Sequence, residues 1–292
     1  MNAHNKTCCL CKKREADQTN SHIVPSFLVK SLFGNGNKKK AFLFNSDKLA
    51  QETQFSQDSD KEDYILCREC EMYFSVLETH VATRVNNRIK NRRFDSQFSD
   101  FEAIGLRWRV CNEVNPIIFK LFIYSIIYRC AITTIGVFQH FTLKESELKI
   151  LKEYLTYFKA NDQASVLSKI ALSTIDSIDM KFAFITHDSF LDATNNSVGI
   201  HPGHSESDCY CFLLNEYYLF FSFKDLIVNQ VTRFKKITNS KSDQEVKIGF
   251  MSTEQWAAME NGLLSIVMKT GINKIIEKGE FGQVMERLNK KR

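Results

Sequence analysis

Four of the nine cysteines form two pairs with the same spacing. Two residues separate Cys8 from Cys11, and two separate Cys67 from Cys70. Each pair brings two thiolates to one tight turn, and two such turns complete a tetrahedral zinc site. Zinc binding contributes about 10–16 kcal/mol in small modules, which can fold a segment that lacks its own core. We therefore predict one structural Zn²⁺ ion on these four residues; Cys9 could replace Cys8 but lacks the matching spacing, and four unrelated buried thiols are the alternative.

A histidine lies between the two cysteine pairs in a short motif. His22 belongs to Ser-His-Ile-Val-Pro at residues 21–25, and the second pair belongs to Leu-Cys-Arg-Glu-Cys-Glu at residues 66–71. The apolar residues 64–66 predict a short strand that runs into the second pair. Apolar positions from Met72 to Val85 then follow one face of a helix. Histidine suits the role of a base because its ordinary pKa near 6.5 leaves it neutral at cell pH.

This order of motifs resembles the HNH endonucleases, in which a ββα hairpin and helix carry a catalytic metal and a four-cysteine zinc site holds them together. A weaker likeness to a group of bacterial HNH-like proteins extends to the apolar helix at residues 120–129. The resemblance implies that His22 is the general base that takes a proton from water. It also implies that Glu71, Glu78 and Asp63 are candidate ligands of one catalytic Mg²⁺ or Mn²⁺ ion.

The motif departs from the family pattern at three places. Ser21 stands where the family has a metal-binding histidine or aspartate, and Glu71 replaces the histidine of the helix. Glu62 or Asp63 stands where the family has the asparagine that orients the base. Carboxylates suit a hard divalent cation, and Glu78 lies two turns beyond Glu71 on the same helical face. Structural alternatives stay open, since the histidine could hydrogen-bond within the zinc module and Glu71 could favour the helix dipole.

A basic stretch continues the helix that is predicted after the second cysteine pair. Its cations are Arg84, Arg88, Lys90, Arg92 and Arg93, with no acid among them. Arg84 and Arg88 would share one helical face, from which both could reach phosphates. Charge runs are usually solvated faces, but this one continues the helix of the candidate active site. We therefore predict that the stretch binds nucleic acid.

Composition and length are those of an ordinary globular protein. The 292 residues are 43% hydrophobic and 25% charged, and the net charge of +5 permits a polyanionic partner without requiring one. No apolar leader segment is visible, and no apolar run approaches the ~18 residues that span a bilayer. We therefore expect a cytoplasmic protein with reduced cysteines and no membrane partner.

The patterns together predict an α+β fold in two parts. A ββα-metal or treble-clef zinc module would occupy residues 1–95, and a larger domain of mixed helices and antiparallel strands would occupy residues 101–292. The polar residues 34–62 predict a loop or a loose hairpin. The larger domain is expected to contain the following elements: two or three helices over 101–160 with the central one buried, strands over 181–186, 210–223 and 247–250, a helix that starts with a capping box at Ser252 and ends near 269, and a last helix over 272–290.

These features predict a metal-dependent HNH-like endonuclease that hydrolyses nucleic-acid phosphodiester bonds, with DNA expected before RNA. The resemblance also suggests a role in bacterial defence against phage or mobile DNA. Two alternatives stay open. One is a catalytically inactive zinc module that binds nucleic acid, which Ser21 and Glu71 favour. The other is an interaction subunit in which the second domain docks a protein partner or forms an oligomer.

Overall fold

The computed structural model covers most of the chain. It describes residues 6–30, 41–43, 54–56, 59–89, 91–103, 105–175, 178–187, 200–204, 209–224, 236–241, 244–259 and 261–262, without the side chains of 41–43, 54–56 and 200–204. Three predicted features lie outside the described residues: Lys90 of the basic stretch, the end of the helix predicted from Ser252, and the helix predicted over 272–290.

Helices and strands both contribute to the fold, which confirms the α+β class. The helices are α1 (Ser26–Val29), α2 (Arg68–Val81), α3 (Asn87–Ile89), α4 (Pro116–Ile132), α5 (Glu145–Phe158) and α6 (Gln163–Leu172), with the π-helical turn η3 (Ala82–Asn86) and the 3₁₀ helices η4 (Arg92–Gln97) and η5 (Gly136–Phe138). The strands are β1 (Ser21–His22), β2 (Ala41–Leu43), β3 (Gln54–Ser56), β4 (Lys61–Glu62), β5 (Phe98–Ala103), β6 (Leu106–Cys111), β7 (Lys181–His187), β8 (Ile200–His204), β9 (Tyr210–Leu214), β10 (Tyr217–Ser222) and β11 (Lys247–Met251).

A seven-stranded sheet forms one side of the molecule, in the order β5-β6-β11-β7-β10-β9-β8. Its neighbours pair antiparallel except β11 and β7, which are parallel. The prediction of antiparallel strands alone is therefore wrong for this pair, because β11 enters between β6 and β7 after a long connection that can set either direction. Two short antiparallel pairs, β1 with β4 and β2 with β3, lie outside the sheet. The second pair agrees with the loose hairpin predicted over 34–62.

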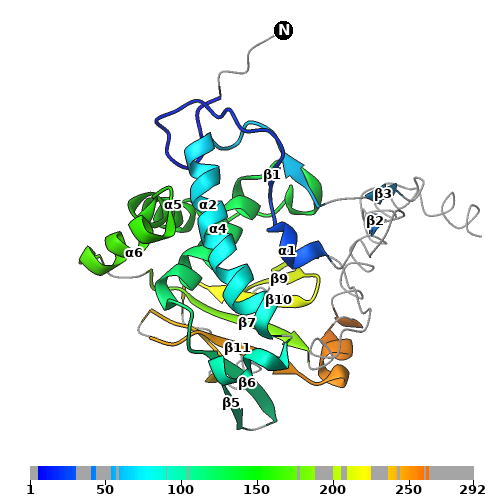
Figure 1. Cartoon of the computed structure of the whole chain (residues 1–292). Coiled ribbons are helices and arrows are strands. Elements are labelled where there is room, and N and C mark those ends of the chain that lie inside the picture. The colour runs from blue at the N-terminus through cyan, green and yellow to red at the C-terminus, as the bar shows by residue number, and fades with distance from the viewer. Residues whose placement is uncertain are drawn as a thin grey trace, which may run out of the picture.

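Helix α4 packs between the sheet and α2 (Figure 1) and is buried from Ile118 to Cys130. Its apolar residues face every direction, so it can only be stable when it is surrounded, as the sequence predicts. Asn115 starts the helix: its side chain accepts hydrogen bonds from the backbone N–H groups of Ile117 and Ile118, next to Pro116 at the first helical position. None of the helices in the described ranges combines the length and the apolar character that crossing a membrane would need.

Two local predictions are wrong. Residues 64–66 do not form a strand, because Tyr64 has a left-handed backbone with φ 59°, and the partner strand of β1 lies earlier, at β4. The helical reading of the start of 101–160 is also wrong, since β5 and β6 form a hairpin there and β6 pairs with β11. The capping box at Ser252 is confirmed, since Ser252 and Gln255 exchange hydrogen bonds between side chain and backbone N–H.

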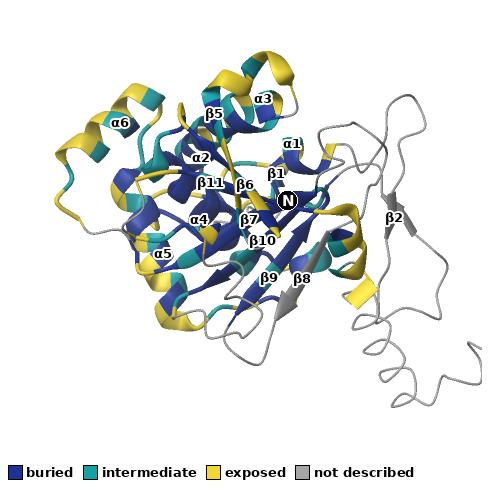
Figure 2. Cartoon of the chain, turned by 90° about the horizontal axis from the view of Figure 1, so that it is seen from below, coloured by how far each residue is buried: buried dark blue, intermediate teal, exposed yellow. Residues whose placement is uncertain are grey.

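The buried residues form a core that runs through both predicted parts (Figure 2). One continuous cluster contains Cys8 and Leu77 from the first part and Phe122 and Phe212 from the second. The division at residues 95–101 stays a prediction, and the two segments share this core.

The loop after α4 is fixed to β4 and to the residue before it by two carboxylates. Glu62 accepts hydrogen bonds from the hydroxyl groups of Thr133 and Thr134, at 2.6 and 2.7 Å. Asp60 accepts one from the backbone N–H of Val137, at 3.0 Å. Since Gly136 has φ 65°, the chain can turn directly over the Asp60 carboxylate, where a Cβ atom would overlap it.

We predict that Gly136→Ala destabilises the fold more than Gly105→Ala. Both glycines have left-handed backbones, so each substitution costs about 1–2 kcal/mol of strain. A Cβ at Gly105 meets nothing within 4 Å among the described residues, whereas one at Gly136 displaces Asp60 and breaks its hydrogen bond, for about 1 kcal/mol more. Urea unfolding of the two variants measures the difference; equal losses would show that Asp60 does not hold this loop.

Candidate metal centre and hairpin–helix site

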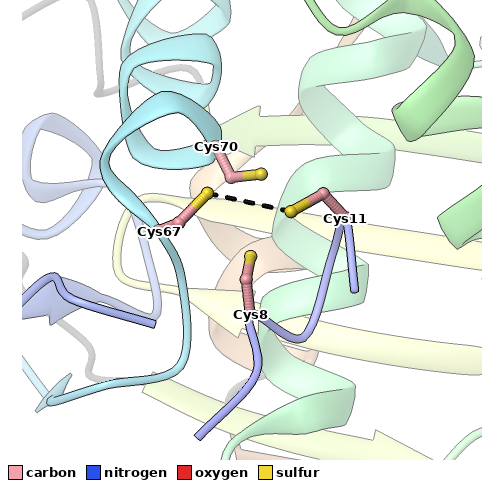
Figure 3. A group of neighbouring side chains, drawn as sticks. All are labelled: Cys8, Cys11, Cys67 and Cys70. Carbon is pink, nitrogen blue, oxygen red and sulfur yellow. Dashed lines mark hydrogen bonds between the residues drawn. The ribbon is translucent and has the colours of Figure 1, made fainter. Parts of the chain in front are cut away.

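The four predicted cysteines meet at the start of α2 (Figure 3). All four are buried, and their Sγ atoms all lie within 4.8 Å of one another. The Sγ atoms of Cys11 and Cys67 are 3.8 Å apart. A tetrahedral zinc ion with Zn–S bonds of about 2.3 Å places its sulfurs about 3.8 Å apart. The cluster could therefore hold a zinc ion, as the spacing of the cysteines predicts.

Backbone hydrogen bonds shape the two cysteine turns. In the first turn, the N–H of Lys12 donates to the carbonyl of Cys8, and Lys12 takes a left-handed backbone with φ 53°. In the second, Cys67 lies at the N-cap of α2, and its carbonyl accepts from the N–H groups of Cys70 and Glu71. The two turns are joined where the N–H of Cys9 donates to the carbonyl of Ile65.

The electrostatics of the cluster favour a bound cation. A hydrogen bond with the Cys70 thiol lowers the pKa of Cys8. The same bond raises the pKa of Cys70, and burial raises the pKa of Cys67. Since four thiolates this close repel one another, all four can be charged together only around a cation such as Zn²⁺.

His22 lies in β1, which forms a two-stranded antiparallel sheet with β4, the last strand before α2. The chain between the two strands includes α1, β2 and β3, and the pair β1–β4 is called the hairpin below. Strand β1 pairs antiparallel with β4, which places Ser21 opposite Glu62 and His22 opposite Lys61. The imidazole Nδ1 of His22 lies 2.7 Å from the hydroxyl of Ser59. Two strands followed by a helix thus carry the predicted histidine, in the order that the sequence motifs suggest.

Ser21 connects this hairpin to α2. Its side chain is buried, and its hydroxyl donates a hydrogen bond of 3.1 Å to the Glu71 carboxylate. Burial raises the pKa of Glu71, against the opposing effects of the Arg129 charge and the Ser21 hydrogen bond. Successive side chains of a strand leave on opposite faces, so Ser21 faces the helix and His22 leaves β1 on the other face.

Arg129 of α4 is the residue of this region that sequence reasoning missed as a contributor to the site. Its guanidinium is buried, with the side chain 1% exposed, and forms a 2.7 Å ion pair with Glu78. It also donates a 2.8 Å hydrogen bond to the backbone carbonyl of His22, and it lies over the ring of Phe74. An arginine within an almost wholly apolar helix is the signal that could have found it, because a buried charge needs a partner.

The predicted carboxylate ligands do not gather around one point. Glu71 is bonded to Ser21 and Glu78 is paired with Arg129, while Asp63 accepts a 2.7 Å hydrogen bond from the N–H of Asn20 and so fixes the turn before β1. In the part of the chain that the structure describes, the four cysteines are the only group of three or more potential metal ligands. The carboxylates therefore do not fit the Mg²⁺ or Mn²⁺ ion that the resemblance implies.

The basic stretch is divided between two environments. Arg88 is paired with Glu113 at 2.6 Å and lies over the ring of Phe94, so its charge is engaged within the fold. Arg84 is half-buried in the π-helical turn η3. A π-helical turn is wider than an α-helical one, so Arg84 and Arg88 do not share the α-helical face that their spacing of four residues predicts. Arg92 and Arg93 are exposed in η4.

We predict that Cys67→Ser lowers the zinc content below one ion per chain and destabilises the protein. The loss of one thiolate should lower the free energy of unfolding by about 3 kcal/mol or more, a fraction of the total zinc contribution. Cys9→Ser is the matched control, since Cys9 adjoins the cluster without belonging to it. Elemental analysis and urea unfolding measure both effects; full zinc content in Cys67→Ser would remove this residue from the site.

Comparison of the chain with protein-family models, with curated proteins and with solved structures gives no match.

Proposed function

We propose that this protein is an HNH-like nuclease with a zinc-stapled ββα module. The observation that supports this best is the β1–β4 hairpin, which carries His22 and leads into α2 at the four-cysteine cluster. Zinc at the cysteines would have a structural role, because four thiolates leave no open position for a substrate.

His22 is the proposed general base. In this role Nδ1–H of the imidazole would donate to the Ser59 hydroxyl, 2.7 Å away, and Nε2 would accept a proton from water. The resulting hydroxide would attack the phosphorus atom; one P–O bond forms, the opposite P–O bond breaks, and the leaving oxygen takes up a proton. No step is assigned to Mg²⁺ or Mn²⁺, since the carboxylates of the site do not fit such an ion.

A specific observation favours a second candidate function. The two carboxylates of α2 that were predicted as metal ligands, Glu71 and Glu78, already have partners within the protein, Ser21 and Arg129, which suits a module that has kept its fold and lost hydrolysis. Such a protein would bind nucleic acid without cutting it. The exposed Arg92 and Arg93 would contact the phosphates in either case, with DNA as the expected polymer.

We predict that His22→Ala lowers the rate of nucleic-acid cleavage by about 10²–10⁴-fold, the usual contribution of a general base. Plasmid DNA, single-stranded DNA and RNA are incubated with the full chain in Mg²⁺, Mn²⁺ or EDTA. His140→Ala is the matched control, an exposed histidine outside β1 and β4. Cleavage by wild type that survives in His22→Ala would exclude His22 as the base, and binding without cleavage by wild type would favour the second candidate.

We also predict that Arg92→Ala with Arg93→Ala weakens nucleic-acid binding and reduces the slope of log affinity against log salt by about 1–2, because up to two phosphate contacts are lost. The charge-matched control is Lys149→Ala with Lys152→Ala on α5. Fluorescence anisotropy over a salt series measures both pairs. If the arginine pair keeps the wild-type slope, η4 does not face the nucleic acid.

A further inference from the structure

Arg129 brings a permanent positive charge into the junction of hairpin and helix. Arginine stays protonated throughout the physiological pH range, so its charge must be matched by partners where it is buried. The side chain is 1% exposed, and acids lie on the neighbouring face of α2: Glu78 pairs with it directly, and its charge also acts on Glu71.

The guanidinium gathers oxygen atoms from three separate elements. One nitrogen contacts the backbone carbonyl of His22 in β1 at 2.8 Å, and another contacts the carboxylate of Glu78 in α2 at 2.7 Å. The Nε atom donates to the carbonyl of Ser125 within α4, at 3.3 Å. Carbonyl and carboxylate oxygens are also the ligands that Mg²⁺ and Mn²⁺ prefer. The planar guanidinium thus satisfies the same types of oxygen that a divalent ion would need here.

We propose that Arg129 is a built-in cation that takes the place of the divalent ion expected between the hairpin and α2, so that Glu71 and Glu78 bind neither Mg²⁺ nor Mn²⁺. The comparison with a divalent ion rests on the proposed ββα module. A divalent ion at Glu78 would lie beside the guanidinium and be repelled by it in a buried, weakly screened environment. Ser21 completes the arrangement, because its hydroxyl satisfies the Glu71 carboxylate without a metal.

The test is Mn²⁺ binding to the zinc-loaded full chain, followed by electron paramagnetic resonance. Wild type, Glu71→Gln and Glu78→Gln are expected to bind Mn²⁺ equally weakly. Arg129→Met removes the cation and leaves both carboxylates, so it is expected to bind Mn²⁺ about tenfold or more tightly than wild type, a gain that Glu78→Gln added to this variant should abolish.

Two results would overturn the proposal: a Mn²⁺ site in wild type that either glutamine substitution removes, or a folded Arg129→Met that gains no Mn²⁺ binding. Should Arg129→Met fail to fold, the Mn²⁺ affinities of wild type, Glu71→Gln and Glu78→Gln test the proposal on their own. Cleavage is assayed in the same samples. Absence of cleavage by wild type would count against the nuclease and leave the Mn²⁺ result intact, so the two failures are distinguishable.

Discussion

Burial of the Arg129 charge is the constraint on which the hairpin–helix region depends. An arginine side chain this far from water is tolerated only when oxygen atoms of the protein surround its charge. Those oxygens come from β1, from α2 and from α4 itself, so the three elements must adopt one mutual arrangement before the charge is satisfied. The apolar surroundings of α4 supply the stability, and the arginine fixes which residues face one another.

Two charged centres of different kinds therefore lie on α2. At its first turn, four sulfurs lie close enough to hold a zinc ion, which would bind the loop of Cys8 to the helix. Two turns further on, Glu78 forms an ion pair with the guanidinium of Arg129, a cation that belongs to the protein itself. The first centre depends on an ion from solution and the second does not. With zinc bound, the position of the hairpin would be set both by the metal and by the folding of α4, and His22 lies on that hairpin.

The sequence was most informative where chemistry depends on short spacing. Two cysteine pairs predicted the cluster because a two-residue spacer nearly dictates its own turn, and Ser21–His22 was found as a strand before the predicted helix. Contacts between distant residues could not be predicted in this way. Nothing local indicates that Glu78 pairs with Arg129, or that the π-helical turn η3 changes the direction of Arg84. The β5–β6 hairpin is a local pairing that was wrongly read as part of a helix, and only the pairing of β6 with β11 joins residues far apart in the chain.

The contacts of β4 with the loop after α4 have a consequence for biosynthesis. Asp60 and Glu62 leave the ribosome well before Thr133, Thr134 and Val137, their hydrogen-bond partners. Until the later residues emerge, these carboxylates stay hydrated and the hairpin lacks its contacts with the loop after α4. The N-terminal segment is synthesised first but gains these contacts late. Contacts between residues so far apart in the chain raise the contact order, which slows folding. Residues 1–95 alone would therefore carry all four cysteines and both strands of the hairpin, but would lack the hydrogen-bond partners of Asp60 and Glu62.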